Sequence, residues 1–524
     1  MADISKIEEF WDDNPIDVSA EVNFIWSIAN KLRGPYQSDK YKDVIIPMVI
    51  IRRFECALQE TKDAVVAQYK KMTTYPAKAM YKISGYQFYN TSEFTLAELV
   101  NDADHLASNF KSYINGFSAN IQDIIKNLEF DKQIDKMDKH NRLLAVVKAF
   151  SEIDLDPKVI DNMKMGYIFE ELIRKFSENA EAGDHYTGRD IIKAMVSILL
   201  AEGCDDIFDD GKIVTILDQA AGTGGMLSTA NNYIKRFNPT ADVRLFSQEV
   251  NPESYAMCLA EMLIRGQNAD NIRLQDTMKA DCFTDTKMRF VIENPPFGQP
   301  WGGKDAPEGD EEAVKAEVLK GTSGRFPAGA PSSGDMQLLF IQSAINKMDD
   351  ECGRAAIIEN GSPLFSGGTS SGESQIRRWL LENDYIEAII QLSTDMFYNT
   401  GIATYIWVLS KNKRAERKGK IQLIDASHLC NKLRKNLGNK KCEITPKDRV
   451  AITKLYADFK ENEHCQIYDN TEFIYREYAV MQPLQRSYAI AEDRINAMLS
   501  SGALSTLYDE AKVDELENMD ELTG

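Results

Sequence analysis

The chain has 524 residues, 43% of them hydrophobic and 27% charged. This is the composition of a globular protein with room for roughly three domains of about 150 residues each. Its formal net charge of −20 argues against a protein that grips DNA unaided, because such proteins usually carry a basic surface. The acidity still permits a local basic groove, or DNA contact borrowed from a partner, and an acidic surface by itself promotes solubility.

Several other classes of protein are not expected. The first residues lack the basic region and apolar core of a signal peptide, and the longest apolar stretch, 44–51, is interrupted by Pro47 and too short to span a membrane. The eight cysteines and five histidines are scattered without metal-ligand spacing, which predicts reduced thiols, no metal site and a cytoplasmic location. The chain has no G-x-x-x-x-G-K-[ST] phosphate loop, so no ATP-driven motor is expected.

Residues 1–165 predict a helical N-terminal domain. Apolar residues recur there with helical period, and no run shows the alternation of strands. The expected helices cover residues 21–31, 44–58, 96–109, 121–127 and 143–150. Asp156-Pro157 marks a break, and a further helix is expected over 166–176.

Residues 166–430 predict an α/β domain, because strand and helix patterns alternate. The expected strands cover 214–217, 243–247, 272–274, 290–292, 354–358, 386–391, 405–409 and 421–425. The expected helices start near Met226 and cover 252–265, 335–347 and 375–383. Such alternation indicates a parallel or mostly parallel sheet with helices on both faces.

A long segment rich in glycine, proline and serine interrupts this pattern at residues 299–334. Loops of this length without secondary structure are uncommon in compact domains and are usually functional or disordered. We interpret the segment as a substrate-gated lid, with an insertion that has no role as the alternative.

Residues 431–524 predict a C-terminal helical region that ends in an acidic tail. Helices are expected over 446–462 and 492–498, with a short segment at 473–481 between them. The last twenty residues are strongly acidic, which suits a solvated tail or a helix that docks on a partner.

A glycine-rich turn follows the first strand. Residues 218–225, Asp-Gln-Ala-Ala-Gly-Thr-Gly-Gly, open the next helix, and glycines let backbone approach a ligand where a side chain would clash. Glu249 ends the second strand, where dinucleotide-binding folds place an acid that binds ribose hydroxyls. Asp276, after the third strand, could hold an adenine amino group. The pattern indicates a nucleoside ligand without choosing between NAD and S-adenosylmethionine.

The fourth strand ends in Asn294-Pro295-Pro296-Phe297. Two prolines remove two backbone donors and fix φ, so the chain leaves the sheet in a stiff shape. The turn leaves an amide side chain, a proline carbonyl and an aromatic ring together at the strand end where α/β sheets bind ligands. Two acceptors and a stacking face suit a planar molecule with an exocyclic NH2 group, although Asn-Pro and Pro-Pro are also ordinary turn signals.

With these motifs in this order, the chain resembles class I amino-methyltransferases that use S-adenosylmethionine, and more narrowly the modification (M) subunits of type I restriction–modification systems. The resemblance covers 32–34, 41–54, 183–195, 217–227, 248–266, 294–298, 335–348, 360–388, 397–411, 425–427 and 472–484. The chain departs from the family pattern at Gln219 and Gly188, where proline is usual, at Glu293, where a small residue is common, and at Gln275, where glycine is usual.

The resemblance implies a class I (Rossmann-like) methyltransferase domain at 166–430, with 431–524 docking a partner. It implies transfer of a methyl group to the N6 of a flipped adenine in double-stranded DNA, within a complex of two M subunits and one specificity (S) subunit, which a restriction (R) subunit could join. The catalytic residues would be Asn294, Pro295, Pro296 and Phe297. The cofactor-binding residues would be Gly183, Asp184, His185, Tyr186, Thr187, Asp218, Ala220, Gly222, Thr223, Gly224, Gly225, Glu249 and Asp276.

Two other functions stay open. Methyltransferases that act on protein glutamine or RNA guanine use similar Asn-Pro-Pro-aromatic turns, although the long helical N-terminal region and the segments after residue 335 favour DNA. A scaffold that only holds the S subunit would not need Glu249, Asn294 and Phe297. An NAD oxidoreductase would leave the Asn-Pro-Pro-Phe turn without a purpose.

Overall fold

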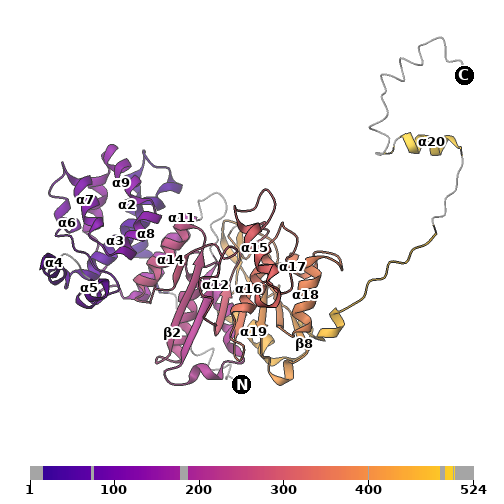
Figure 1. Cartoon of the computed structure of the whole chain (residues 1–524). Helices are drawn as coiled ribbons and strands as arrows, with labels where there is room; N and C mark the ends of the chain where they lie inside the picture. Colours follow the sequence, from indigo (N-terminus) through magenta and orange to yellow (C-terminus); the bar gives the residue numbers. More distant parts are fainter. Residues whose placement is uncertain are drawn as a thin grey trace, which may run out of the picture. The chain divides into compact units, whose positions relative to one another are not determined.

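The computed structural model describes residues 16–71, 76–177, 187–398, 400–483, 490–499 and 501. The chain forms two compact units, residues 1–475 and 476–524, and Figure 1 shows its elements in chain order. Among the described residues, no helix has the length and apolar character needed to cross a membrane. The second unit contains α20 (Glu492–Leu499).

The N-terminal part is helical, as the periodicity predicts. Its helices are α2 (Ser19–Ala29), α3 (Lys42–Leu58), α4 (Lys62–Lys71), α5 (Ala77–Ser84), α6 (Leu96–Leu99), α7 (Leu106–Asn115), α8 (Ala119–Asn127), α9 (Phe130–Lys139), α10 (Leu143–Ser151) and α11 (Asn162–Ser177). The single helix expected over 96–109 is wrong. A capping box of Thr95 and Glu98 starts α6, and the turn around Asp102 separates it from α7.

A nine-stranded, mostly parallel sheet forms the centre of the molecule, in the order β11-β8-β6-β7-β5-β4-β1-β2-β3. The strands of its core are β1 (Ile213–Asp218), β2 (Asp242–Glu249), β3 (Ile272–Leu274), β4 (Phe290–Glu293), β5 (Arg354–Asn360), β6 (Ile386–Gln391), β7 (Thr404–Ser410) and β8 (Lys420–Asp425). Strand β7 runs antiparallel between β5 and β6, while β3, β2, β1, β4 and β5 are parallel to one another.

Helices cover both faces of the sheet, and alternate strand residues point to opposite faces. The helices are α12 (Arg189–Ala201), α13 (Gly225–Phe237), α14 (Pro252–Ile264), α15 (Asp310–Leu319), α16 (Gln337–Lys347), α17 (Ser362–Phe365), α18 (Gly372–Glu382) and α19 (Pro446–Asp458). In β4, Phe290 and Ile292 join a core shared with α12, α13 and α14, whereas Val291 joins a core shared with α16 and α18. Figure 1 shows the helices on the two sides of the strands.

The part after residue 430 adds strands as well as helices. Strand β11 (Cys465–Asp469) pairs antiparallel with β8 at the edge of the main sheet, and β9 (Asn431–Leu437) forms a separate two-stranded hairpin with β10 (Lys440–Glu443). The periodicity predicts α19 but not these strands. Strand β9 is rich in exposed polar residues and has no apolar alternation that would signal it.

The segment 299–334 has structure of its own. It contains α15, and Trp301, Val314 and Phe326 are buried in a third hydrophobic cluster that includes residues of α16. Its ends are tied together, since Trp301 donates its backbone N–H to the carbonyl of Ser333 at 3.0 Å. The segment is therefore a folded insertion rather than a structureless loop, and its gating role stays a prediction.

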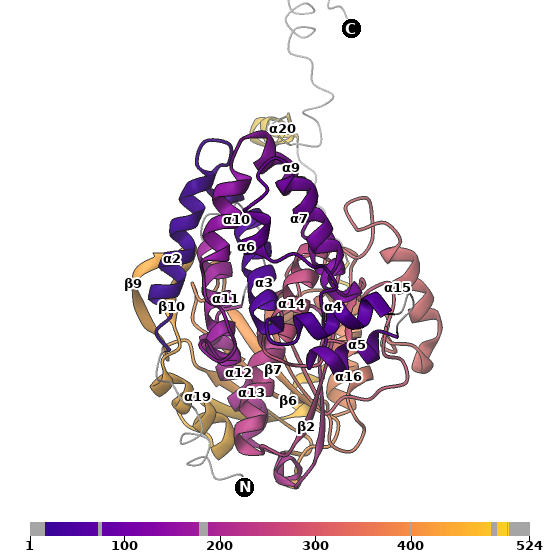
Figure 2. The same cartoon turned by 90° about the vertical axis from the view of Figure 1, so that its left-hand side faces the viewer.

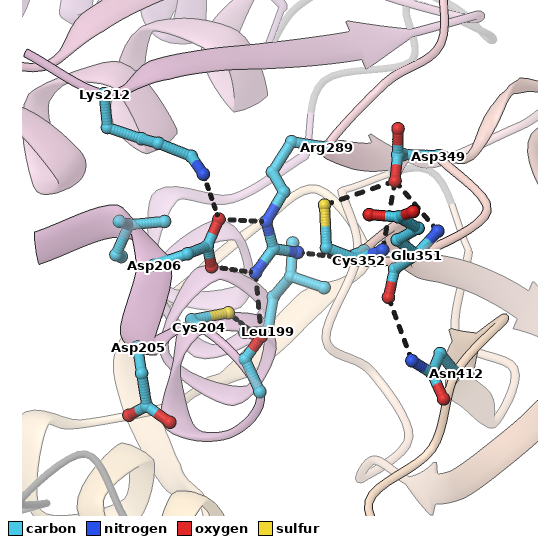
Figure 3. A network of polar contacts seen from close by, with 12 residues as sticks. Leu199, Cys204, Asp205, Asp206, Lys212, Arg289, Asp349, Glu351, Cys352 and Asn412 are labelled. Atoms are coloured by element: carbon cyan, nitrogen blue, oxygen red, sulfur yellow. Dashed lines mark hydrogen bonds and ion pairs between the residues drawn. The ribbon is translucent and has the colours of Figure 1, made fainter. Parts of the chain in front are cut away.

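The amino edge of the sheet, opposite the ends discussed below, is held by a buried guanidinium. Arg289 lies just before β4 and is 4% exposed. It forms two hydrogen bonds with Asp206, at 3.1 and 2.7 Å, and also bonds the carbonyls of Gly203 and Cys352 (Figure 3). A buried arginine is tolerated when its donors are satisfied in this way, so it fixes the start of β4.

Candidate functional site

The candidate site lies where β1, β2 and β4 end. These strands are neighbours and parallel, so the residues that follow them share the carboxyl edge of the sheet. This edge brings together Asp218, Glu249 and Asn294 from three separate parts of the sequence. In open α/β sheets, ligands bind outside this edge.

The glycine loop, residues 218–225, is held by Glu249. The Glu249 carboxylate accepts the backbone N–H of Gly222 at 2.7 Å and that of Asn251 at 2.8 Å. Gly224 has φ +86°, and a side chain there would meet the Cys258 sulfur of α14 at 2.8 Å. A carboxylate has about four acceptor positions, so Glu249 keeps capacity for further donors such as ribose hydroxyls.

Carboxyl groups from four adjacent strands are buried at this edge. Burial, with a smaller contribution from the charge of Glu249, raises the pKa of Asp218 to about 8. Burial also raises the pKa of Glu249. The pKa values of Glu293 in β4 and Glu359 in β5, both fully buried, lie well above the ordinary range, chiefly because of burial. A cation bound next to these carboxyl groups would favour their ionised forms and so lower their pKa values.

Asp276 touches the folded insertion. One of its oxygens accepts the backbone N–H of Met278 at 2.9 Å, and Lys279 lies 3.7 Å from Asp276 and 3.6 Å from Asp310. Asp310 begins α15 and is 1% exposed. Burial, followed by the charge of Asp276, raises the pKa of Asp310 to about 7. The insertion therefore reaches the residue that we expect to recognise an adenine amino group.

Asn294 is oriented by a residue from another part of the chain. Its side-chain Nδ2 donates to the Thr187 hydroxyl at 2.9 Å, and Thr187 is 8% exposed. Its Oδ1 is buried and has no hydrogen-bond partner in the described part of the chain. An amide whose donor is satisfied and whose acceptor is left open is suited to bind an N–H group.

Phe297 lies beside a second aromatic residue. Its ring is partly buried and meets Phe397 edge-on, with centroids 6.1 Å apart and an interplanar angle of 78°. Phe397 is 2% exposed, so Phe297 packs against a buried side chain. An edge-to-face contact uses at most one face of a ring, so Phe397 leaves at least one face of Phe297 for stacking.

The predicted site residues fall into two groups. Gly183, Asp184, His185 and Tyr186 lie outside the described residues. The others lie at the carboxyl edge: Thr187, Asp218, Ala220, Gly222, Thr223, Gly224, Gly225, Glu249, Asp276, Asn294, Pro295, Pro296 and Phe297. Sequence reasoning did not assign roles to Glu359 and Phe397, because a single glutamate at a strand end and a single phenylalanine in a loop carry no local signal.

A mostly parallel sheet with one antiparallel strand, helices on both faces and this constellation at its carboxyl edge defines a class I S-adenosylmethionine-dependent methyltransferase fold. A family model described as N-6 DNA Methylase matches residues 160–492, and a model of the HsdM N-terminal domain matches residues 22–150. The chain thus belongs to the N-6 DNA methylase family, among the modification subunits of type I restriction systems, as the motifs predict.

Individual relatives agree with this assignment. The chain is 24% identical over 428 residues to the type I restriction enzyme MjaIX methylase subunit of Methanocaldococcus jannaschii, covering 78% of this chain and 72% of that protein. It is 27% identical over 338 residues to the type I restriction enzyme MpnII methylase subunit of Mycoplasma pneumoniae, covering 62% of this chain and 57% of that protein. The methyltransferase subunit of a type I restriction-modification system from Streptococcus thermophilus shares the fold, with a TM-score of 0.68, 20% identity and coverage of 86% and 96%.

Proposed function

We propose that this protein transfers a methyl group from S-adenosylmethionine to the exocyclic N6 of an adenine flipped out of double-stranded DNA. We further propose that it works as the M subunit of a type I complex, with two M chains per S subunit that reads the sequence. A restriction subunit could join the complex. This substrate would place the enzyme in the cytoplasm.

The observation that carries the proposal is the open Oδ1 of Asn294. The adenine amino nitrogen is a poor nucleophile, because its lone pair is delocalised into the ring. Acceptors at the Asn294 side chain and the Pro295 carbonyl would bind both N–H groups and favour a pyramidal nitrogen. This is catalysis by positioning and electrostatic stabilisation, and it needs no general base.

Phe297 would stack on the extruded base. Flipping a base costs a few kcal/mol, and stacking on an aromatic ring offsets part of that cost. The edge-on contact with Phe397 would keep the Phe297 ring in one orientation. The same pair of residues therefore supports both substrate binding and in-line placement of the amino group.

The residues at the carboxyl edge fit S-adenosylmethionine. Glu249 has acceptor capacity for the ribose, Asp276 for the adenine amino group, and the glycine loop allows close backbone approach. A sulfonium cation beside Asp218 would lower the raised pKa of this buried carboxyl and be stabilised by its ionised form. When bound, the cofactor supplies an electrophilic methyl group.

Mass spectrometry of nucleosides from DNA incubated with the complex and labelled S-adenosylmethionine tests the proposal. We expect N6-methyladenine, lost in Phe297→Ala and largely kept in Phe297→Trp, which retains a stacking face. Label found in protein glutamine or RNA guanine instead would overturn the DNA assignment. Absence of cofactor binding in calorimetry would favour a scaffold that only holds the S subunit.

A further inference from the structure

Two stretches of this acidic chain are rich in lysine and arginine, and they differ in how many of these cations form ion pairs. In residues 411–420, four cations form ion pairs: Lys411 with Asp350, Lys413 with Asp384, Arg414 with Asp205, and Arg417 with Glu202. Residues 431–441 contain five cations and no carboxylate. The first stretch is therefore a neutralised structural element, whereas the second leaves a net positive charge.

The second stretch is the β9–β10 hairpin, which is fixed along β10. Lys440 pairs with Asp190 at 2.8 Å and donates to the carbonyl of Met396 at 3.0 Å. The backbone N–H of Lys441 donates to the carbonyl of Asp395 at 2.8 Å. At the turn, Gly438 has φ +61°, and a side chain there would meet the Tyr398 carbonyl oxygen at 2.7 Å. The contacts of β10 and of the turn thus hold the hairpin in place.

Strand β9 carries the unneutralised charge. Lys432, Arg434 and Lys435 are exposed and form no ion pair with any described residue. Among the strands that the structure describes, β9 pairs only with β10, and Figure 2 shows the hairpin at the outer edge of this part of the chain. Lysines on an edge strand also discourage aggregation, which is the purely structural role that this arrangement could have.

The hairpin is bonded to two segments that contain residues of the candidate methyl-transfer site. On one side, the segment that binds β10 contains Phe397, which contacts Phe297. On the other side, Asp190 is three residues from Thr187, the acceptor for Asn294. The phosphates that flank a base flipped out at Asn294 would pass close to this hairpin.

We propose that the β9–β10 hairpin is a phosphate-contacting arm that holds the DNA backbone next to the flipped adenine through Lys432, Arg434 and Lys435. The inference rests on the proposed function for its ligand, double-stranded DNA. Phosphate contacts supply most non-specific affinity for DNA, and a chain with a net charge of −20 needs local cations at the substrate rim to overcome repulsion.

The test measures, by fluorescence anisotropy at several salt concentrations, how tightly a labelled 24-base-pair duplex binds to the complex of the full-length chain with its S subunit. In the triple variant K432A/R434A/K435A we expect affinity to fall about tenfold or more. The slope of log affinity against log salt should decrease by about three, because each lost phosphate contact removes about one released counterion. The conservative variant K432R/R434K/K435R should bind like the wild type.

The matched control removes three exposed lysines from elsewhere: K418A/K454A/K460A. Lys418 precedes β8, so it lies towards the amino edge of the sheet, away from the site. This control variant should bind DNA like the wild type. If the salt slope is unchanged in the hairpin variant as well as in the control, the proposal is overturned, and the role of the charges on β9 is to keep an edge strand from aggregating. Cofactor binding by calorimetry should be unchanged in the hairpin variant. Methyl transfer to the same duplex is measured with the same complex. If this complex binds the duplex without methylating it, the proposed function fails, while the binding comparison still decides the role of the hairpin.

Discussion

The backbone N–H of Gln219 donates a hydrogen bond to the Glu293 carboxylate at 3.3 Å. Gln219 belongs to the glycine loop after β1, and Glu293 directly precedes Asn294 at the end of β4. Both residues are among the departures from the family pattern noted above, in which proline is usual at 219 and a small residue is common at 293. Because proline has no N–H, a buried carboxyl at 293 needs a residue other than proline at 219, and the two departures accompany each other.

We therefore predict coupled effects on stability. Gln219→Pro alone should lower the free energy of unfolding by about 1–3 kcal/mol, because it leaves the Glu293 carboxyl without its donor. The double variant Q219P/E293A removes the orphaned acceptor and should recover part of that loss. Urea unfolding of the four proteins of the cycle measures the coupling, and additive effects within about 0.5 kcal/mol would contradict it.

Removing the Asn294 side chain should lower the rate of methyl transfer without weakening cofactor binding. In Asn294→Ala we expect kcat to fall about 10²–10³-fold, the usual cost of one preorganised stabilising group, with the Kd for S-adenosylmethionine largely unchanged. Thr187→Val leaves the amide in place but removes the group that orients it, so its loss of kcat should be smaller. Single-turnover methyl transfer together with calorimetry measures both quantities. Near-normal transfer by Asn294→Ala would refute the assigned role.

Glu249 should be needed both for the cofactor and for the loop. Glu249→Ala leaves the Gly222 and Asn251 N–H groups without their acceptor and removes the proposed ribose contact. We expect cofactor affinity to fall at least about tenfold and the melting temperature to drop by a few degrees. Glu253→Ala is the matched control: it removes a glutamate four residues further on, in α14, where a partly exposed ion pair with Lys42 is lost. Equal effects in both variants would contradict the prediction.

Asp310 should make stability depend on pH. Its pKa is about 7 in the fold and 3.8 ordinarily, so between these values the folded state holds a proton that the unfolded chain has released. The resulting stabilisation is present below about pH 4 and is lost as the pH rises through about 7, where the ionised group faces Asp276 and only Lys279 compensates. Asp310→Asn has no such loss, so its melting temperature relative to wild type should rise from pH 5.5 to pH 8.5. A constant difference across this range would rule out the titration of Asp310.

Local patterns in the sequence predict most of the fold. The strands and helices that the sequence predicts in the α/β part are found within a few residues of their expected positions, since buried strands and amphipathic helices have distinct apolar periods. Helices α12, α15 and α17 are not predicted. The errors occur where the period is weak. Polar residues around Asp102 divide one expected helix, and β9 has no apolar alternation because neither of its faces is buried.

The fold of the insertion at residues 299–334 could not be predicted from apolar periodicity either. Its glycine- and proline-rich composition indicates a loop, yet Trp301, Val314 and Phe326 bury themselves against α16. Three apolar residues spread over 26 positions have no periodicity, so only the tertiary structure shows that they share one cluster.

The sequence by itself determined the order of the chemical groups: the glycine loop, the strand-terminal Glu249 and the Asn294-Pro295-Pro296-Phe297 turn, each set by neighbouring residues. Only the tertiary structure decided which groups meet. It placed Thr187 against Asn294 and the carboxyl of Glu293 against Gln219, and it joined the basic hairpin to Asp190. The first two contacts join residues that are 74 or more positions apart, and that between Gln219 and Glu293 arises because β1 and β4 are neighbours in the sheet.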